Sequence, residues 1–308
     1  MSIRPWPVAS ICRHCNARHG RNGCRTRFLR VFLVSPGRQG QARRSRVSVD
    51  VYSEKASCER LLSVHRWTDK LLTFRTTRPA GYAFTAGQFA RLGLEIDGEI
   101  VSRAYSITSA VDEDQLEYYA IVVPGGKFTT RLDALRPGDP VWVEKLSYGF
   151  MTADRFTDGK QLWMLATGTG LGPYLSILQQ KEVWEKFDDM VVVHGVRQRE
   201  ELAYADKFEA LRQQAKSQGL PGRLHYLRAV TREEVTPDSG LLHGRITTLL
   251  RDGTLERTTG LAIDAAQSRL MACGNPEMVT EVRELLRERG MTPLRRAGGG
   301  QFVTEDYW

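Results

Sequence analysis

Two short stretches of this 308-residue sequence combine residue types that could bind nucleotides. The first is Arg103-Ala104-Tyr105-Ser106, on a predicted strand whose alternation puts Arg103 and Tyr105 on the same face. A guanidinium can bind phosphate oxygens bidentately, and the tyrosine ring offers a flat apolar surface beside a serine hydroxyl. A flavin nucleotide would need this combination. A cross-strand aromatic pair next to a solvated arginine is the alternative interpretation.

The second stretch spans residues 162–178, LWMLATGTGLGPYLSIL, in which an apolar run ends in Gly168, Gly170 and Gly172. Pro173 follows at a natural first helical position, so the pattern predicts a strand, a glycine turn and a helix. Such a turn directs free backbone N–H groups and a positive helix end toward one point, which suits a phosphate. The spacing is GxGxG and not the dinucleotide fingerprint GxGxxG, so a purely structural turn is the alternative.

Arginines follow three predicted strand ends farther along the chain, at Arg197, Arg232 and Arg245. An isolated arginine in such a loop is usually a solvated charge. Three at successive strand ends fit a substrate with phosphates better, because guanidinium matches phosphate oxygens bidentately. Glu233 and Glu234 follow Arg232 and leave a choice between a nucleotide with a 2'-phosphate and one with free ribose hydroxyls.

The elements that must position these residues differ between the two halves of the chain. In the first half, turn signals separate short β segments at residues 60–67, 71–76, 88–94, 101–107, 115–123 and 140–145. Six strands at this spacing predict a small antiparallel barrel. A helix predicted over residues 128–135 could cover one open end.

In the second half, predicted strands at residues 162–167, 190–194, 223–230 and 270–272 alternate with helices at residues 173–180, 202–214, 245–251 and beyond 276. This alternation predicts a parallel sheet covered on both faces, with its ligand at the carboxyl ends of the strands. The predicted fold is therefore an all-β antiparallel six-stranded barrel over residues 54–153, followed by an α/β parallel-sheet domain over residues 160–308. Residues 1–53 are expected to be a basic disordered extension.

Taken together, the motifs resemble the ferredoxin-NADP reductase family, and in particular its bacterial flavodoxin/ferredoxin-NADP reductases. The resemblance covers residues 58–308 and rests on FTAGQFARLGLEIDGE, SRAYSIT, GKFTTRL, LRPGD, LWMLATGTGLGPYLSIL, MACGNPEMV and the terminal TEDYW. It implies that the barrel binds FAD and that the α/β domain binds NADP(H).

The resemblance also implies FAD contacts for residues of the barrel, the glycine turn and the end of the chain. Arg103 would bind the FAD pyrophosphate, Tyr105 would pack on the flavin ring, and Ser106 would hydrogen-bond near flavin N5. The full implied FAD set is Arg103, Ala104, Tyr105, Ser106, Ala120, Ile121, Val122, Lys127, Phe128, Thr129, Thr169, Tyr307 and Trp308.

For NADP(H), the resemblance implies pyrophosphate contacts, contacts with the 2'-phosphate, and a close backbone approach. The pyrophosphate contacts are Val196 and Arg197, and the 2'-phosphate contacts are Thr231, Arg232 and Arg245. The close backbone approach is at Gly274, Asn275 and Pro276. It places Cys273 against the nicotinamide as a positioning residue, although a cysteine ending a buried strand is by itself only a small apolar residue. Glu305 is a candidate proton carrier to flavin N5 or Ser106. The predicted catalytic residues are Ser106, Cys273 and Glu305, and no metal is expected.

The net charge of +8 is concentrated at the amino end of the chain. Residues 1–50 hold eleven arginines and one acid, so the remaining chain is close to neutral. The composition of this tail resembles a transit peptide or a disordered arm. Its cysteines and histidine are one residue short of the zinc-knuckle spacing, at Cys12, Cys15, His19 and Cys24. A nucleic-acid or zinc-binding role of the tail is the least favoured hypothesis.

The leading functional hypothesis is an enzyme that exchanges electrons between NADP(H) and a one-electron carrier through FAD. Because the body of the chain has no cysteine cluster for an iron–sulfur centre, the carrier must be a separate protein, and the family implies ferredoxin or flavodoxin. Its docking face could include Arg283, Arg287, Arg289, Arg295 and Arg296. We expect a cytoplasmic monomer without a membrane segment. A flavin reductase that serves another acceptor, such as an oxygenase, shares every motif and is the alternative.

Overall fold

The structure, a computed structural model, describes residues 49–295 and 298–307. Three predictions concern residues outside this range: the arginine-rich tail over residues 1–48 with its cysteine and histidine motif, the docking role of Arg296, and the FAD contact of Trp308. No helix in the described part of the chain is long and apolar enough to cross a membrane.

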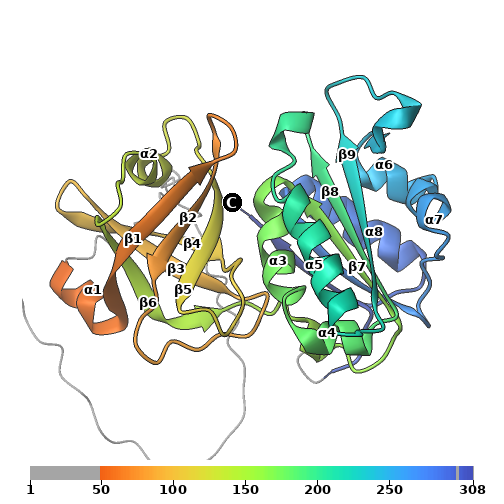
Figure 1. Cartoon of the computed structure of the whole chain (residues 1–308), viewed down its shortest axis with the longest axis horizontal. Coiled ribbons are helices and arrows are strands. Elements are labelled where there is room, and N and C mark those ends of the chain that lie inside the picture. The colour runs from red at the N-terminus through yellow and green to blue at the C-terminus, as the bar shows by residue number, and fades with distance from the viewer. Residues whose placement is uncertain (1–48, 296–297, 308) are drawn as a thin grey trace, which may run out of the picture. The chain divides into compact units, whose positions relative to one another are not determined.

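The first half forms the predicted antiparallel barrel (Figure 1). Its sheet order is β4-β3-β6-β1-β2-β5, and every neighbouring pair is antiparallel. The edge strands β4 and β5 meet through a single bridge between Ile107 and Tyr118. The strands are β1 Ala56–Arg66, β2 Leu71–Thr77, β3 Phe89–Ile96, β4 Glu99–Ser106, β5 Gln115–Ile121 and β6 Pro140–Tyr148.

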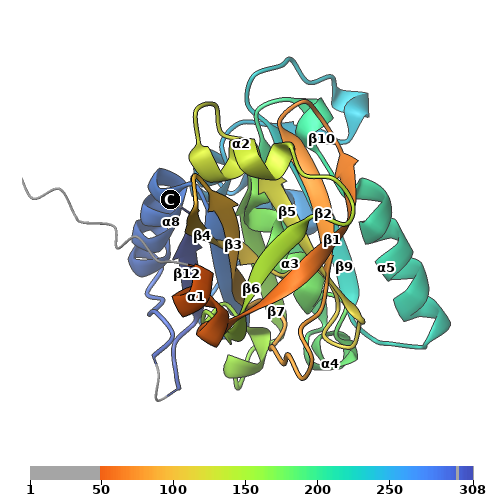
Figure 2. The ribbon, with the colours of Figure 1, turned by 90° about the vertical axis from the view of Figure 1, so that its left-hand side faces the viewer.

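Helix α2, Lys127–Asp133, crosses one end of the barrel strands (Figure 2). It begins directly after the turn at Gly125 and Gly126 and buries Phe128 and Leu132. Both side chains join the apolar interior of the barrel. The predicted helix over residues 128–135 therefore forms, and burial of its two apolar side chains holds it on the strands.

A helix that was not predicted, α1 Val49–Lys55, leads directly into β1. Its Tyr52 is only 2% exposed, packs edge-on against Trp142, and donates a hydrogen bond to Glu144 Oε1 at 3.2 Å. Gly93 of β3 makes room for this ring, because a Cβ there would lie 2.8 Å from it. The folded barrel thus begins upstream of the predicted boundary at residue 54. The prediction was wrong for residues 49–53 because a single large side chain creates no apolar period in the sequence.

The second half is a six-stranded parallel sheet with the order β10-β9-β8-β7-β11-β12. Its strands are β7 Gln161–Thr167, β8 Asp189–Val196, β9 Arg223–Val230, β10 Leu241–His243, β11 Ser268–Gly274 and β12 Phe302–Asp306. The α-helices are α3 Gly172–Ile177, α4 Lys181–Lys186, α5 Ala205–Ser217, α6 Ile246–Arg251, α7 Thr254–Thr259 and α8 Pro276–Glu288. Short 3-10 turns occur at η1 Ala153–Arg155, η2 Gly168–Leu171, η3 Arg199–Glu201 and η4 Pro237–Ser239.

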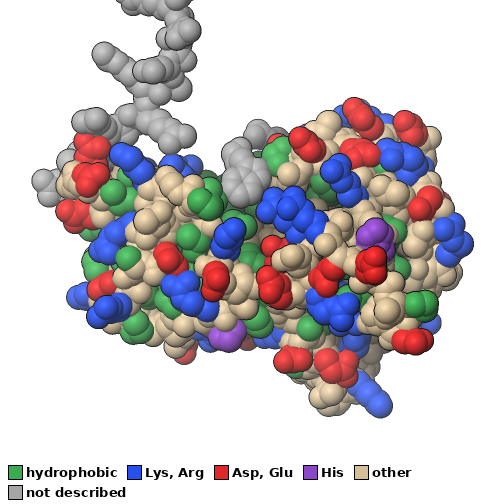
Figure 3. Space-filling view, turned by 90° about the horizontal axis from the view of Figure 1, so that it is seen from above, with side chains coloured by type: hydrophobic (Ala, Val, Ile, Leu, Met, Phe, Trp, Pro, Cys, Tyr) green, Lys and Arg blue, Asp and Glu red, His purple; other side chains and the backbone are tan. Residues whose placement is uncertain are grey.

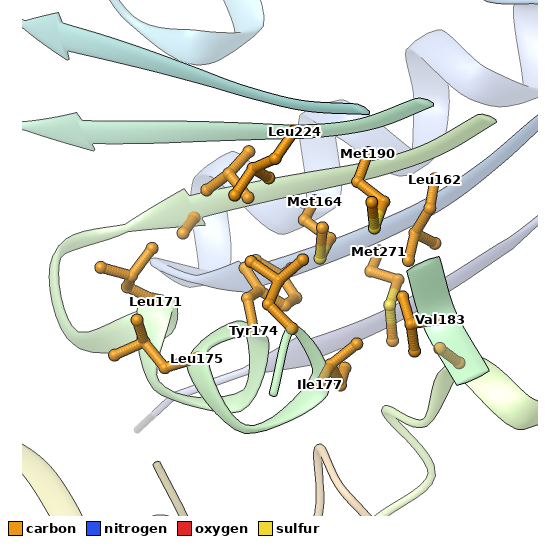
Figure 4. Packing of buried hydrophobic residues seen from close by; sticks show 14 of the residues in the cluster. Leu162, Met164, Leu171, Tyr174, Leu175, Ile177, Val183, Met190, Leu224 and Met271 are labelled. Atoms are coloured by element: carbon orange, nitrogen blue, oxygen red, sulfur yellow. The ribbon is translucent and has the colours of Figure 1, made fainter. Parts of the chain in front are cut away.

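Alternate side chains of β7 enter different cores, as the period of a strand requires. Trp163 and Leu165 face the cluster that includes α6 and α8, whereas Leu162 and Met164 face α3 and α4. Figure 4 shows Leu162, Met164 and other strand side chains meeting those of the segment after the glycine turn. The cluster that contains Leu162 and Met164 also includes residues of the barrel half, among them Leu71, Ala86, Tyr119 and Met151.

Candidate active site

The Arg103-Ala104-Tyr105 segment lies on the edge strand β4. Arg103 and Ala104 are exposed, and along this segment β4 pairs only with β3, so its other backbone edge is free to bind a ligand. No carboxylate of residues 49–295 or 298–307 forms an ion pair with Arg103, whose guanidinium donates to the Ser102 carbonyl at 2.7 Å. The ring of half-buried Tyr105 packs between Phe74 and Phe128.

The turn before α2 lies beside this edge. Lys127 is exposed at the start of α2, which has no side-chain cap at Gly126. Thr129 accepts a hydrogen bond from the Val123 amide at 3.1 Å and lies 3.2 Å from its carbonyl oxygen. The Thr129 hydroxyl therefore shapes the turn. Of the other predicted FAD residues, Ala120 and Ile121 belong to β5, and the Val122 amide donates to the Lys70 carbonyl at 2.7 Å.

The glycine turn packs against the end of β11 with no space for a side chain. A Cβ on Gly170 would lie 2.3 Å from the Cys273 carbonyl oxygen. A Cβ on Gly274 would lie 2.2 Å from Thr167 Oγ1, and Gly274 has a φ of +133° that favours glycine. Thr167 Oγ1 in turn accepts the Asn275 amide at 2.8 Å. Two strand ends are thus held in direct backbone contact at the carboxyl edge of the sheet.

Asn275 and Pro276 begin helix α8. The Asn275 side chain caps the helix by accepting the Glu277 and Met278 amides at 2.9 and 3.1 Å, and Pro276 takes the first helical position. This cap turns the chain sharply after Gly274. The backbone at residues 273–275 therefore faces the glycine turn.

Ser106, Tyr307 and Cys273 meet where the barrel adjoins this edge. The Tyr307 hydroxyl is hydrogen-bonded to Ser106 Oγ, and the Tyr307 amide donates to the Gly274 carbonyl at 3.0 Å. Burial raises the pKa of the Cys273 thiol well above its usual value, and Tyr307 hydrogen-bonds to it. A protonated, fully buried thiol is a poor nucleophile, and the positioning role of Cys273 stays a prediction. Gly172 is close to Ser106 as well, since a Cβ there would lie 3.4 Å from Ser106 Cβ.

Glu305 lies in β12, in register with Cys273, and its carboxyl group is against Gly149. Burial, together with the charge of Asp306, raises the pKa of Glu305 to about 7. The hydroxyl that contacts Ser106 is that of Tyr307. A carboxyl group with this pKa can give or take a proton near neutral pH.

The raised pKa of Glu305 makes folding pH-dependent. The folded protein holds this proton more tightly than the unfolded chain, so the free energy of unfolding should fall as pH rises from about 4.5 to about 7 and then level off. Between pH 5 and pH 8 we expect the wild type to lose about 2 kcal/mol relative to Glu305→Gln. Urea unfolding of both proteins across this range measures the difference, and parallel curves would contradict the pKa.

The predicted NADP residues at the ends of β8 and β9 are linked by hydrogen bonds to the Arg197 carbonyl group. The Arg197 carbonyl accepts the amides of Thr231 and Arg232 at 3.3 and 2.9 Å, and the Thr231 hydroxyl donates to the Val196 carbonyl at 3.3 Å. The Arg197 and Arg232 side chains are both exposed. Arg245 is exposed at the residue before α6.

Two glutamates stabilise these loops. Glu201 Oε2 accepts the amides of Arg197 and Gln198 at 2.7 and 3.1 Å. Glu233 accepts the Arg199 amide and forms an ion pair with the Arg199 side chain. Glu233 is therefore engaged in holding a loop, whereas Glu234 is exposed.

His194 of β8, which was not predicted as a site residue, hydrogen-bonds to the glycine turn. It is completely buried, and burial lowers its pKa to about 4, so the ring is neutral. Nε2 lies 3.2 Å from the Gly168 carbonyl and Nδ1 lies 3.2 Å from the Tyr226 hydroxyl. Because a carbonyl can only accept, Nε2 donates to Gly168 and Nδ1 accepts from Tyr226. A histidine inside the apolar run MVVVHGV was the signal that could have identified it.

Comparison with known proteins agrees with this geometry. Residues 65–146 match the oxidoreductase FAD-binding domain, and residues 164–284 match the oxidoreductase NAD-binding domain. Flavodoxin/ferredoxin-NADP reductase of Escherichia coli K12 is 42% identical over 250 residues, covering 81% of this chain and 97% of that protein. Ferredoxin-NADP reductase A of Sorangium cellulosum is 38% identical over 250 residues, covering 80% and 88%.

The chain belongs to the ferredoxin/flavodoxin-NADP reductase family. The resemblance seen in its motifs is thereby confirmed. A solved ferredoxin-NADP reductase from Neisseria gonorrhoeae, with bound FAD and NADP, matches with a TM-score of 0.76 and 35% identity over 82% of this chain and 98% of that one. This reductase is therefore an oxidoreductase with an FAD-binding barrel and an NAD(P)-binding α/β domain.

The residues at the site fit both nucleotides. The β4 edge offers a backbone edge that no described strand pairs along residues 103–105, a guanidinium with no ion pair to a described carboxylate, and an aromatic ring, which suit a flavin nucleotide. The backbone contact of Gly170 with Cys273, and the exposed arginines at the ends of β8 and β9, suit a second nucleotide with several phosphates. In this reductase the two sets of residues are linked by the contact of Ser106 with Tyr307.

Proposed function

We propose that this chain catalyses electron exchange between NADP(H) and ferredoxin or flavodoxin, with FAD bound on the β4 edge. The observation that carries the proposal is the meeting of Ser106, Tyr307 and Cys273 at the carboxyl edge of the parallel sheet. When bound there, FAD can take two electrons from NADPH as a hydride and release them one at a time. Family membership supports the same reaction.

The roles proposed for the chain's own residues follow from where they lie. Arg103 binds the FAD phosphates, Tyr105 supports the flavin ring, and Ser106 holds a hydrogen bond at the flavin edge. Cys273 is an uncharged buried contact for the nicotinamide. The Tyr307 hydroxyl, already bonded to Ser106, excludes water from the same place.

For NADP(H), Arg197 is proposed to bind the pyrophosphate, and Arg232 and Arg245 are proposed to bind the 2'-phosphate. The Arg197 carbonyl accepts hydrogen bonds from the Thr231 and Arg232 amides, which supports a shared site for the Arg197 and Arg232 side chains. The ion pair between Glu233 and Arg199 supports a preference for NADPH, because it occupies one of the two carboxylates, Glu233 and Glu234, that could bind a free ribose.

The double variant Arg232→Ala/Arg245→Ala tests this preference. We expect KM for NADPH to rise about 100-fold, because each of these two exposed phosphate contacts contributes about 1.5 kcal/mol, and KM for NADH to stay within about twofold. Steady-state kinetics with ferricyanide as acceptor measure both. Arg212→Ala on α5 is the matched control, since Arg212 pairs with Glu209 and the Leu224 carbonyl. An equal loss with both nucleotides would overturn the assignment.

The electron carriers are acidic proteins, so a basic docking face is part of the proposal. Of the predicted residues, Arg287 and Arg295 are exposed, whereas Arg289 is half-buried against Glu256 and Arg283 donates to Thr304 Oγ1 at 2.6 Å. Figure 3 shows Lys and Arg side chains interspersed with Asp and Glu over the face it displays. Docking is therefore expected to depend on a few arginines and to weaken with salt.

We further propose a cytoplasmic monomer. Both described cysteines, Cys58 and Cys273, are free thiols, which suits a reducing compartment. Light scattering during gel filtration measures the mass of the particle.

Purification followed by acceptor assays tests the function. The protein should be yellow, with an FAD spectrum that bleaches faster with NADPH than with NADH. Cytochrome c reduction should require added ferredoxin or flavodoxin. A protein that cannot be loaded with FAD would overturn the proposal, and equal NADPH oxidation with and without carrier proteins would favour a reductase serving another acceptor.

A further inference from the structure

A line of hydrogen bonds among barrel residues passes through Tyr204, the residue of the α/β half that precedes α5. The Tyr204 hydroxyl lies 2.6 Å from Thr73 Oγ1 in β2 and 3.2 Å from Glu117 Oε1 in β5. Trp67 Nε1 donates to Thr73 Oγ1 at 2.8 Å. Tyr204 is 7% exposed, so these bonds are sheltered from water.

The direction of every bond in this line follows from the end groups. An indole N–H can only donate and a carboxylate can only accept. Trp67 therefore donates to Thr73, Thr73 donates to Tyr204, and Tyr204 donates to Glu117. Each hydroxyl accepts one bond and donates one, an arrangement in which neighbouring bonds strengthen each other. Arg75 donates to the other oxygen of this carboxylate, Glu117 Oε2, at 2.8 Å.

The backbone of Tyr204 is held in an unusual conformation. Its φ of 66° lies in the left-handed region, which residues with a Cβ rarely adopt. The ring packs against Trp67 and Tyr119 with centroids 5.0 and 5.2 Å away. A strained backbone persists where surrounding contacts determine it, and at Tyr204 those contacts come from the barrel.

Glu117, at the end of the line, and Tyr204, within it, are each connected to a proposed nucleotide site. Glu117 Oε1 accepts the Thr108 hydroxyl at 3.0 Å, and the Glu117 carbonyl accepts the Thr108 amide at 2.8 Å; Thr108 is two residues after Ser106. On the other side, Glu201 precedes Tyr204 by three residues and binds the amides of Arg197 and Gln198. The Tyr204 hydroxyl therefore links the loop proposed for NADP(H) to the strand proposed for FAD.

We propose that Tyr204 is a positioning residue for hydride transfer, which sets the Arg197 loop in place relative to Ser106. The inference rests on the proposed function. Tyr204 acts through Glu117 and Thr108, so its loss should misplace one nucleotide relative to the other without weakening either site alone. A misplacement of this kind lowers the rate of the chemical step steeply, because hydride transfer requires close contact of the reacting atoms.

Tyr204→Phe tests the proposal, because it keeps the ring and removes only the hydroxyl. We expect kcat for NADPH oxidation by ferricyanide to fall about fivefold to tenfold, with KM and the Kd of 2'-phospho-AMP within about twofold of wild type. Tyr174→Phe is the matched control. Its buried hydroxyl donates to the Leu165 carbonyl at 3.1 Å and lies wholly within the α/β half.

A second measurement does not depend on activity. Hydrogen–deuterium exchange of peptides covering residues 107–117 and 197–204 should quicken in Tyr204→Phe and not in Tyr174→Phe. Thr73→Val should reproduce the loss in kcat, and combining it with Tyr204→Phe should add little, because both interrupt the same line.

An unchanged kcat in Tyr204→Phe would overturn the inference, and so would a loss that follows weaker binding of 2'-phospho-AMP. A failure of the proposed function has a different signature. In that case the wild type would not oxidise NADPH, while the exchange measurement would still report whether Tyr204 couples the two segments.

Discussion

Gly170→Ala should reduce NADPH oxidation about 100-fold while the protein remains folded. The added Cβ would lie 2.3 Å from the Cys273 carbonyl oxygen and 2.6 Å from its carbon, and neither backbone atom can rotate away. The glycine turn and the end of β11 must therefore separate. A shift of about 1 Å at a reacting centre can lower a rate about 100-fold. Stopped-flow absorbance of the flavin on mixing with NADPH measures the step.

Gly168→Ala is the matched control, two residues earlier in the same turn. Gly168 has a φ of +52°, but a Cβ there meets no atom within 4 Å. Its replacement should cost about 1 kcal/mol for the left-handed backbone and reduce the rate much less than Gly170→Ala. Equal losses in the two variants would show that the turn's conformation matters and its contact with Cys273 does not.

Removal of residues 1–53 should destabilise the protein by about 3 kcal/mol relative to removal of residues 1–48, because only the longer deletion removes Tyr52. That deletion empties the space beside Trp142 and Gly93 and takes one hydrogen-bond donor from the buried Glu144. Urea unfolding of the two truncated proteins, each with FAD bound, measures the difference.

Tyr52→Phe in the shorter truncation separates packing from hydrogen bonding. It keeps the ring and should cost only about 1 kcal/mol, since Lys55, Tyr148 and Arg91 still surround Glu144. Identical stability of the 1–48 and 1–53 deletions would mean that α1 is not part of the folded barrel.

The sequence predicts those parts of the fold whose signal is local. Turn residues separate the six barrel strands from one another, and β9 forms over residues 223–230 as predicted. The missed elements lack such a signal. Strand β12, FVTED, carries three polar side chains and forms because its backbone pairs with β11 at the sheet edge. Strand β10 has only three residues and depends in the same way on β9.

Part of the candidate site was likewise predictable from the sequence, and part was not. The rule that ligands lie at the carboxyl ends of parallel strands brings Val196, Thr231 and Gly274 to one edge, as the structure has them. The contacts between the halves were not predictable. Ser106 and Tyr307 are 201 residues apart, and Thr73 and Tyr204 are 131 apart, so their hydroxyl pairs leave no pattern in the chain.

The apolar cluster that contains Leu71, Ala86 and Met151 together with Met164 and Ile177 has a thermodynamic consequence. Gly87 packs closely against the Met151 carbonyl and the Ile177 side chain, so the barrel half and the sheet half share an apolar interface in addition to their separate cores. Separating them would expose apolar surface on both sides. We therefore expect the free energy of unfolding to be partly a joint property, so that a cavity made under α3 weakens the attachment of the barrel as well.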